Sequence, residues 1–375
     1  MTTVVSSLTP IRTDGHKLWK LLFQLSFSDD SPASLAVLRA MLSVASLYRY
    51  GHGDEPLRLK TSALESLNTS MSGRITGTTE IYQHAAVGML LCAFEIFQPS
   101  ESSFEWPLYV SGAKSMLHVI CDGGYPKLME ADLLILWVHY HDILGKFTSR
   151  HWRVQSAENA SIFKIPGMAS TLASVAHDQK WQVLGIFGCS LEMMNLIARM
   201  SEINPDSKIP DNQYTEQAIL DSIEHELMAI NQDITHLIGT NSAEEVEHGR
   251  KISKLYQLAA LIYFERVLKH YSTGGRLARW SAEAFDIIQQ LDICERPFPL
   301  FFVACEAHTD TQREVILSIL RRTQKVSSQR RLYAVHGMIE SMWVQYDLAS
   351  DQGGTSYVDV LDTIMSSNKL LPTLA

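Results

Sequence analysis

Apolar residues recur at three- and four-residue steps along most of this 375-residue chain. This spacing gathers apolar side chains on one face of an α-helix. The first clear case follows Ser31-Pro32, which supplies an N-cap and a first-turn proline, and it ends near Gly51. Its apolar positions are Leu35, Leu38, Met41, Leu42, Ala45 and Tyr48. Runs that alternate Val, Ile, Thr and aromatic residues are scarce, so the pattern favours helices over a β-sheet.

The same periodicity predicts helices down the whole chain. The second helix is expected to begin after Ser62, which forms the capping pattern Ser62-x-x-Glu65. Further predicted helices cover 79–97, 107–122, 130–148, 180–203, 214–238, 247–271, 280–292, 310–325, 328–348 and 356–366. The segment Leu255–Phe264 is apolar nearly all round its helix, so we expect it at the centre of a bundle. The predicted fold class is all-α, a large irregular bundle of about ten or more helices.

The irregular stretches of the chain bear on its domain organisation. They cover 98–105, 150–178, 204–213 and 272–279, and none is long or biased enough to be an independent linker. We predict an N-terminal extension over residues 1–30, partly disordered, followed by a helical domain over residues 31–370. A break near 204–213 leaves two closely packed lobes as the alternative. Helices on both sides of that break are too apolar to stay uncovered, which favours one cooperative unit.

Charge and cysteine content narrow the classes of function. The chain has 41 acidic and 32 basic side chains, a formal net charge of −9. Such a surplus repels phosphate backbones, so we expect no direct nucleic-acid binding. The five cysteines lie far apart and form no C-x-x-C pair, which indicates neither a disulfide framework nor a cysteine zinc site. No uncharged apolar stretch approaches the roughly 18 residues of a membrane span, so no membrane partner is predicted.

Two sequence constellations suggest metal binding at first sight. In His139-Tyr140-His141-Asp142, the two histidines would point about 200° apart on a helix and could not chelate one ion. The pair Glu245-x-x-His248 has the spacing of di-iron bundles, but those sites need a second such pair, and the sequence has none. We therefore expect a solvated helix start there. Hydrolase, phosphate-loop and dinucleotide motifs are also absent from the sequence, so we predict no catalytic residue, no metal ligand and no cofactor.

A basic cluster near the end of the chain has two interpretations. Arg321, Arg322, Lys325, Arg330 and Arg331 place five positive charges within eleven residues. A solvated helix C-terminus, which the helix dipole favours, is the simpler one. A nuclear-import or anion-binding patch is the other. No aromatic residues are interleaved as a stacking surface for single-stranded nucleic acid would require.

Six short segments, read in order, carry a family resemblance. They are Trp106-x-x-Tyr109-x-x-Gly112-Ala113 continuing to Gly123-Gly124, Tyr140-His141-Asp142-Ile143-Leu144, Gly188-Cys189 with Leu196-Ile197, Ala259 to Tyr263, Pro299 to Ala307 followed by Arg313, and Trp343. Together they resemble the regulatory region of fungal-specific transcription factors, the helical part that usually follows a zinc binuclear cluster DNA-binding domain. The resemblance covers roughly residues 31–365. We expect Cys305-Glu306-Ala307, followed by the capping pattern Thr311-x-x-Glu314, to form a turn that joins two helices.

The resemblance implies a regulatory domain that acts through protein or small-ligand interactions. Its implied partners are other transcription regulators or a zinc-cluster DNA-binding protein, together with a small-molecule effector. Family members usually carry six zinc-binding cysteines upstream, whereas no cysteine precedes Cys92 here, so we expect no DNA-binding domain in this chain. The implied location is nuclear, or cytoplasmic if the protein acts without a DNA-binding partner.

Other functions stay open at this point. A stand-alone helical interaction protein is one alternative, and a repurposed helical enzyme in a biosynthetic pathway is another. The enzyme would need convergent polar groups, and those clustered in sequence are His139, His141, Asp142 and His151. For a regulatory domain we expect the effector pocket between core helices, near Tyr109, His141 and Tyr263.

Overall fold

Helices dominate the computed structural model of this protein. The structure describes residues 12–51, 53–73, 75, 77–97, 105–123, 131–152, 181–203, 213–238, 241–269, 274–326, 331–349, 356–368 and 371–375. Its α-helices are α2 (Arg12–Ser26), α3 (Pro32–Tyr50), α4 (Asp54–Met71), α5 (Thr78–Phe97), α6 (Trp106–Gly123), α7 (Asp132–His151), α10 (Leu191–Glu202), α11 (Gln213–Ala229), α12 (Ala243–Tyr263), α13 (Gly274–Gln289), α14 (Pro297–Ala304), α15 (Asp310–Val326), α16 (Arg331–Ala349) and α17 (Tyr357–Ser367). Shorter elements are a 3-10 helix at Thr235–Leu237, a π-helical turn at Phe264–Leu268, and the antiparallel strands β1 (Val183–Leu184) and β2 (Cys189–Ser190). The predicted all-α class is confirmed.

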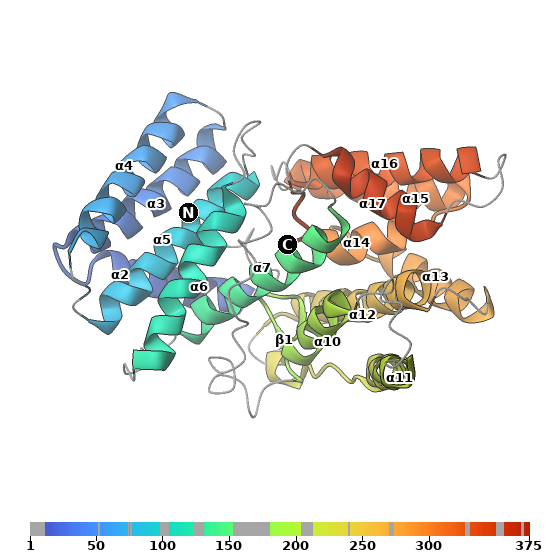
Figure 1. Cartoon of the computed structure of the whole chain (residues 1–375). Coiled ribbons are helices and arrows are strands. Elements are labelled where there is room, and N and C mark those ends of the chain that lie inside the picture. The colour runs from blue at the N-terminus through green and yellow to red at the C-terminus, as the bar shows by residue number, and fades with distance from the viewer. Residues whose placement is uncertain are drawn as a thin grey trace.

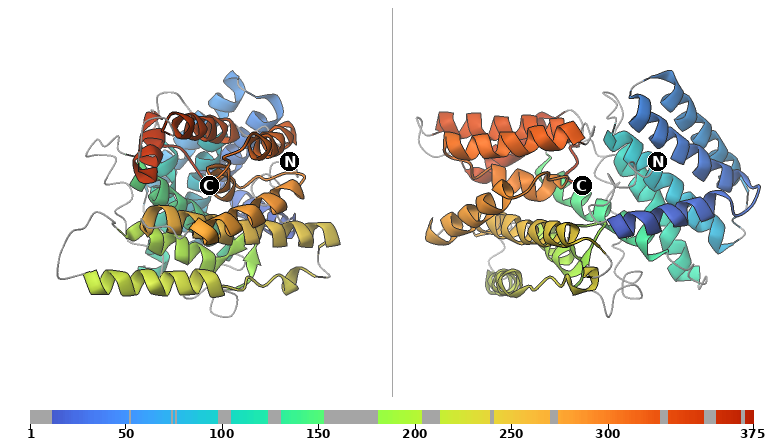
Figure 2. Two further views of the ribbon diagram at one scale, coloured as in Figure 1. Left: turned by 90° about the vertical axis from the view of Figure 1, so that its right-hand side faces the viewer. Right: turned by 180° about the vertical axis from the view of Figure 1, so that it is seen from behind.

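The helices form two groups joined by α7. Helices α2 to α6 pack on one another in one half of the molecule, and α10 to α17 occupy the other half (Figure 1). Helix α7 lies between them and contacts α2, α5 and α6 on one side and α10 and α17 on the other. The two further views show the same division (Figure 2). The predicted break near 204–213 falls almost entirely outside the described residues, so a lobe boundary there stays a prediction.

Helix α12 is the centre of the second group. It contacts α10, α11, α13 and α14. Its segment Leu255–Phe264, which continues into the π-helical turn, is buried throughout. The prediction that this apolar segment forms a central helix is therefore confirmed.

Helix α2 precedes every helix that the sequence analysis predicted. It buries four leucines at three- and four-residue steps: Leu18, Leu21, Leu22 and Leu25. This short apolar stripe packs on α3 and contacts α5 and α7. The sequence does contain this periodic pattern, but the pattern consists of four leucines on one face of a single helix. The domain boundary at residue 31 stays a prediction.

One predicted helix start and one predicted helix cap are wrong. Helix α4 begins at Asp54, and Ser62 lies inside it, where its carbonyl accepts a hydrogen bond from Ser66 Oγ at 2.9 Å. Helix α15 is capped by Thr309, whose Oγ1 accepts from the Gln312 amide at 3.3 Å while Gln312 Oε1 accepts from the Thr309 amide at 3.1 Å. Both predictions chose a Ser/Thr-x-x-Glu pattern in the sequence. Helix α15 begins at Asp310 as predicted, with Thr309 as its cap in place of Thr311, whereas α4 begins well before Ser62.

The helix predicted from residue 180 begins only at Leu191. Residues before it form the β1–β2 hairpin, in which the Gly188 amide donates to the Leu184 carbonyl at 2.8 Å. Gly188 has φ of 77°, a left-handed conformation that cannot continue a right-handed helix. Ser190 then caps α10 by accepting from the Met193 amide at 3.2 Å.

Replacing Gly188 by alanine should lower the free energy of unfolding by about 1–3 kcal/mol, because strain and a steric clash add. A Cβ there would lie 2.9 Å from Ile252 Cγ2 and 3.4 Å from Arg296 Nε, in addition to the positive φ. Urea denaturation followed by circular dichroism measures the effect. The matched control is Gly112→Ala in α6, where a Cβ meets nothing within 4 Å. That variant should be neutral or stabilised, and equal losses in both variants would contradict the steric account.

Candidate functional site

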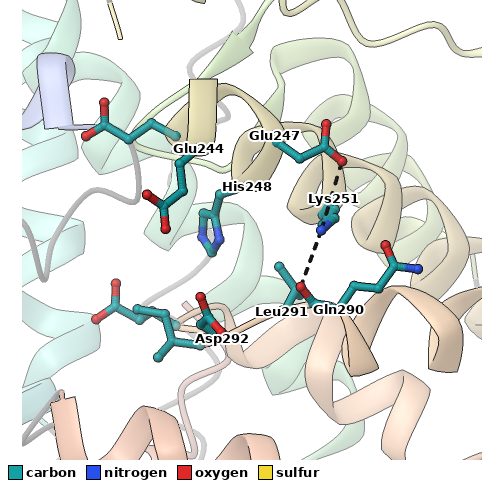
Figure 3. Close-up of a pocket in the computed structure, with 10 residues that line it drawn as sticks. Glu244, Glu247, His248, Lys251, Gln290, Leu291 and Asp292 are labelled. Atoms are coloured by element: carbon teal, nitrogen blue, oxygen red, sulfur yellow. Dashed lines mark hydrogen bonds and ion pairs between the residues drawn. The ribbon is translucent and has the colours of Figure 1, made fainter. Parts of the chain in front are cut away.

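A surface pocket lies between the first turns of α12 and the chain that connects α13 to α14. Its volume is about 390 Å³, within the range of about 300–1,000 Å³ typical of small-ligand sites. The lining residues are Glu244, Glu245, Glu247, His248, Lys251, Gln290, Leu291, Asp292, Ile293 and Glu295. Figure 3 shows Glu244 and His248 projecting from α12 toward Asp292 on the opposite wall. The pocket therefore joins two segments, 244–251 and 290–295, that are far apart in sequence.

A capping box positions the α12 side of the pocket. Ser242 Oγ accepts from the Glu245 amide at 3.2 Å, and Glu245 Oε2 accepts from the Ser242 amide at 3.1 Å. Glu244 and Glu245 lie in the first turn of α12, where the helix dipole favours carboxylates. Glu245 therefore has a structural role, and the prediction of a helix start around Glu245 and His248 is confirmed.

Basic side chains hold the opposite wall in place. Lys251 Nζ donates to the Gln290 carbonyl at 3.3 Å and lies 4.0 Å from Glu247. From α15, Arg322 donates to the carbonyls of Leu291 and Asp292, both at 2.9 Å. The connection that follows α13 is thus fixed to α12 on one side and to α15 on the other.

The pocket is strongly acidic. Its carboxylates belong to Glu244, Glu245, Glu247, Asp292 and Glu295, and Lys251 is the one side chain of fixed positive charge in the lining. Burial lowers the pKa of His248 below 6.5, and the charges of Arg296 and Lys251 lower it further, so the imidazole is neutral at pH 7. Within the described part of the chain, no hydrogen bond or ion pair engages the side chains of Glu244, His248 or Asp292. The carboxylates of the lining give the pocket a negative potential.

The pocket was not predicted from the sequence. Its acidic residues come from two short segments, 244–247 and 292–295, and nothing in a single sequence shows that these segments meet. The local signal was a helix start with several glutamates, and its ordinary meaning is a solvated surface.

The histidine constellation of α7 does not form one site. Asp142 pairs with the Lys114 ammonium at 2.9 Å from both carboxylate oxygens and with Lys146 at 3.1 Å. The other members are also buried: His141 Nδ1 lies 3.0 Å from the Trp137 carbonyl, and His139 is 7% exposed. Across the described ranges, no group of three or more His, Cys, Asp or Glu side chains is arranged to hold a metal ion.

His151 belongs to a separate buried chain of polar groups. Its Nδ1 lies 2.7 Å from Asp362 Oδ1 in α17, and its Nε2 lies 3.0 Å from the Tyr263 hydroxyl in α12. This chain ties α7 to two helices of the second group. It is enclosed by aromatic rings, among them Phe147 and Phe302. The arrangement stabilises helix packing and lies apart from the acidic pocket.

The three residues expected to lie around an effector pocket contact different partners. The Tyr109 hydroxyl donates to Glu105 at 2.9 Å in α6, and that carboxylate also pairs with Lys60. His141 lies inside α7, and Tyr263 lies against His151. None of the three lines the pocket described above, so the expected location stays a prediction without support from that pocket.

The stability of the protein should fall by on the order of 3 kcal/mol between pH 7 and pH 4 through His139 alone. Burial lowers the pKa of His139 from 6.5 to about 4, and the side chain is 7% exposed. Between these values the unfolded chain binds a proton that the native protein does not, so acid favours unfolding. Urea midpoints measured across this pH range should fall less steeply for His139→Leu than for the parent. The substitution His225→Gln, at an exposed position, serves as control. If the urea midpoint of His139→Leu falls with pH as steeply as that of the parent, the loss of stability does not come from His139.

Two residues of the basic cluster, Arg321 and Arg322, have partners within the protein. Arg321 pairs with Glu314 at 3.0 Å, and Arg322 holds the pocket wall as described. Arg330 and the side chain of Arg331 lie outside the described residues. Lys325 is exposed in the last turn of α15, and a role of the cluster in nuclear import or anion binding stays a prediction.

Comparison with known proteins identifies the family. A family model described as the fungal specific transcription factor domain matches residues 1–369. The protein named transcription factor iacI from Pestalotiopsis fici is 30% identical over 374 residues, which cover 98% of this chain and 91% of that protein. No solved structure matches the chain, and no helix among the described residues combines the length and apolar character needed to cross a membrane. Because the family match extends over nearly every residue, the chain belongs to the fungal specific transcription factor domain family.

Proposed function

We propose that this chain is the regulatory region of a transcription regulator and acts through protein or small-ligand interactions, without contacting DNA itself. The observation that carries the proposal is the family match over residues 1–369, which includes nearly the whole helical body. The net charge of −9 supports a role away from the DNA backbone. The partner is another transcription regulator or a zinc-cluster DNA-binding protein, and the place of action is the nucleus.

The acidic pocket is the proposed effector site. Its size suits a small molecule, and its side chains Glu244, His248 and Asp292 are available to a ligand. Carboxylates facing one another across a pocket raise the local concentration of cations. The effector class is therefore a small organic cation, such as a polyamine or a basic metabolite.

A reporter experiment tests the regulatory role. The full chain is fused to an unrelated DNA-binding domain, and transcription of a reporter with the matching operator is measured in a fungal host. A regulatory region should change reporter output at least several-fold relative to the DNA-binding domain alone. The Phe298→Ala variant, expected to be strongly destabilised, provides a control for folding. Unchanged output from a fusion present at normal level would count against the proposal and in favour of a helical interaction protein outside transcription.

Thermal denaturation tests the effector site separately. Spermidine at millimolar concentration should raise the melting temperature of the parent protein, because a ligand that binds the native state stabilises it. The variant Glu244→Gln/Asp292→Asn should lose most of that increase. The matched control Glu202→Gln/Asp286→Asn makes the same charge change at exposed positions outside the pocket. Equal shifts in both double variants would show general screening of a negative protein and no pocket binding.

A further inference from the structure

Helix α11 is attached to the body along one narrow apolar stripe. From residue 217 to the end of the helix, the buried side chains are Ile223 and Leu227, with Ile230 just beyond and Leu220 half-buried. Ile219 and Met228 are 45% and 46% exposed. Figure 1 shows α11 end-on at the lower edge of the molecule, and Figure 2 shows it lying along the outside. Helices that bury so little surface open locally at low cost.

Ion pairs provide most of the remaining attachment. Glu224 of α11 pairs with Lys269 and, at 2.7 Å, with Arg276. Glu226 forms a two-pronged pair with Arg199 of α10 at 2.6 and 3.0 Å. These basic side chains are 21–40% exposed and Glu224 is 16% exposed, and ion pairs that water reaches contribute little net stability.

A hydrogen bond joins α11 to the central helix. Gln257 Nε2 of α12 donates to the Leu227 carbonyl at 2.8 Å. This carbonyl belongs to the last turn of α11, where main-chain acceptors lack partners within the helix. The surface under α11 therefore has an apolar floor, since α11 contacts α10 and α12 and its Ile223 and Leu227 belong to the hydrophobic core. It also has a polar anchor at Gln257 and a basic rim formed by Arg199, Lys269 and Arg276.

We propose that α11 is a detachable cover, and that the groove beneath it binds an acidic amphipathic helix of a partner protein. Helix α11 itself defines the chemistry of that partner: apolar residues at the spacing of Leu220, Ile223, Leu227 and Ile230, with carboxylates at the positions of Glu224 and Glu226. A partner helix of this pattern satisfies the basic rim and the apolar floor as α11 does. This proposal rests on the regulatory function proposed above. Under that function, displacement of α11 by a partner helix would couple partner binding to regulation.

Hydrogen exchange of the full chain tests detachment. Amides of residues 217–229 should exchange at least tenfold faster than those of Leu255–Phe264, because α11 opens without global unfolding. Glu224→Gln should accelerate exchange in α11 several-fold further while leaving the central helix unchanged. Glu202→Gln, an exposed change in α10, is the matched control and should have no effect. Equal protection of α11 and α12 would overturn the proposal.

A synthetic peptide tests the groove. A fluorescein-labelled copy of residues 213–230 should bind Glu224→Gln at least tenfold more tightly than the parent protein, because the weakened α11 competes less with the peptide. A peptide carrying Ile223→Asp and Leu227→Asp should not bind either protein. Failure of the first peptide to bind would contradict the proposal. If the reporter fusion remained active in that case, the regulatory function would stand while the groove proposal fell.

Discussion

Replacing Arg266 by methionine should destabilise the protein by about 3–5 kcal/mol, because it strands a buried carboxylate. Arg266 donates to both oxygens of Glu306 at 2.9 and 2.8 Å, and Glu306 is 3% exposed. The pair joins the π-helical turn after α12 to the turn between α14 and α15. The guanidinium also stacks on the ring of Tyr357 in α17, 5.6 Å from its centroid. Loss of Arg266 therefore removes both the charge partner and a packing contact among three segments.

The pH dependence of this variant gives a second readout. Burial raises the pKa of Glu306, but the neighbouring His308 and Arg266 outweigh burial and hold it below 4.5 in the native protein. In the parent, the lowered pKa of Glu306 means that its carboxylate stabilises the native state above pH 4.5. That contribution is lost as the pH falls through the lowered pKa. Without Arg266, burial should raise the pKa of Glu306. The difference in the free energy of unfolding between variant and parent should therefore shrink as the pH falls from 7 to 4.

Urea denaturation of three variants checks the prediction. The double variant Arg266→Met/Glu306→Leu should recover much of the loss, since apolar replacements of both partners leave no stranded charge. The exposed pair formed by Arg58 and Glu55 offers the matched control, and Arg58→Met should leave the midpoint unchanged. A double variant as unstable as the single one would show that packing on Tyr357, and not the ion pair, is decisive.

Replacing Phe298 by alanine should cost about 3–5 kcal/mol, the range for removing a buried aromatic ring. Phe298 is fully buried, and its ring centroid lies 5.2 Å from that of Phe147 in α7 and 5.8 Å from that of Tyr256 in α12. The ring of Phe302, one turn along α14, lies 5.1 Å away. Phe298 thus joins α14 to the helix between the two groups and to the central helix.

The same denaturation measurement applies to Phe298→Ala. The control is Phe27→Ala, which removes an identical ring that is 64% exposed and should change stability by less than about 0.5 kcal/mol. Comparable losses in the two variants would contradict the placement of Phe298 at the junction of α7, α12 and α14. A cost near 1 kcal/mol for Phe298→Ala would show that the site collapses around the missing ring.

The sequence predicted the fold class well and several local starts poorly, for identifiable reasons. The central position of Leu255–Phe264 followed from an apolar pattern that leaves no polar face. The start at Ser62 was wrong because a capping pattern also occurs by chance inside helices. The helix predicted from residue 180 was interrupted by Gly188, whose left-handed conformation is specified by the hairpin and by Ile252 and Arg296 packed around it.

The candidate site also combines a feature that the sequence predicted with features that it did not predict. The capping of α12 by Ser242 and Glu245 depends on residues three apart, which a sequence reveals directly. The pocket depends on Asp292 and Glu244 lining the same cavity, and they do so because α13 packs on α12. The histidine cluster of α7 looked like one constellation in sequence, yet the helix directs His141 and His151 to different neighbours.

The sequence by itself determined that this chain is helical, that its most apolar helix lies inside, and which family its ordered motifs resemble. These properties depend on periodicity and residue type within single segments. The tertiary structure alone decided which polar groups are buried together, where the acidic pocket opens, and that α11 is held by a single stripe and partly exposed ion pairs. Those features arise from contacts between residues far apart in the chain, and one sequence does not specify such contacts until the helices have packed.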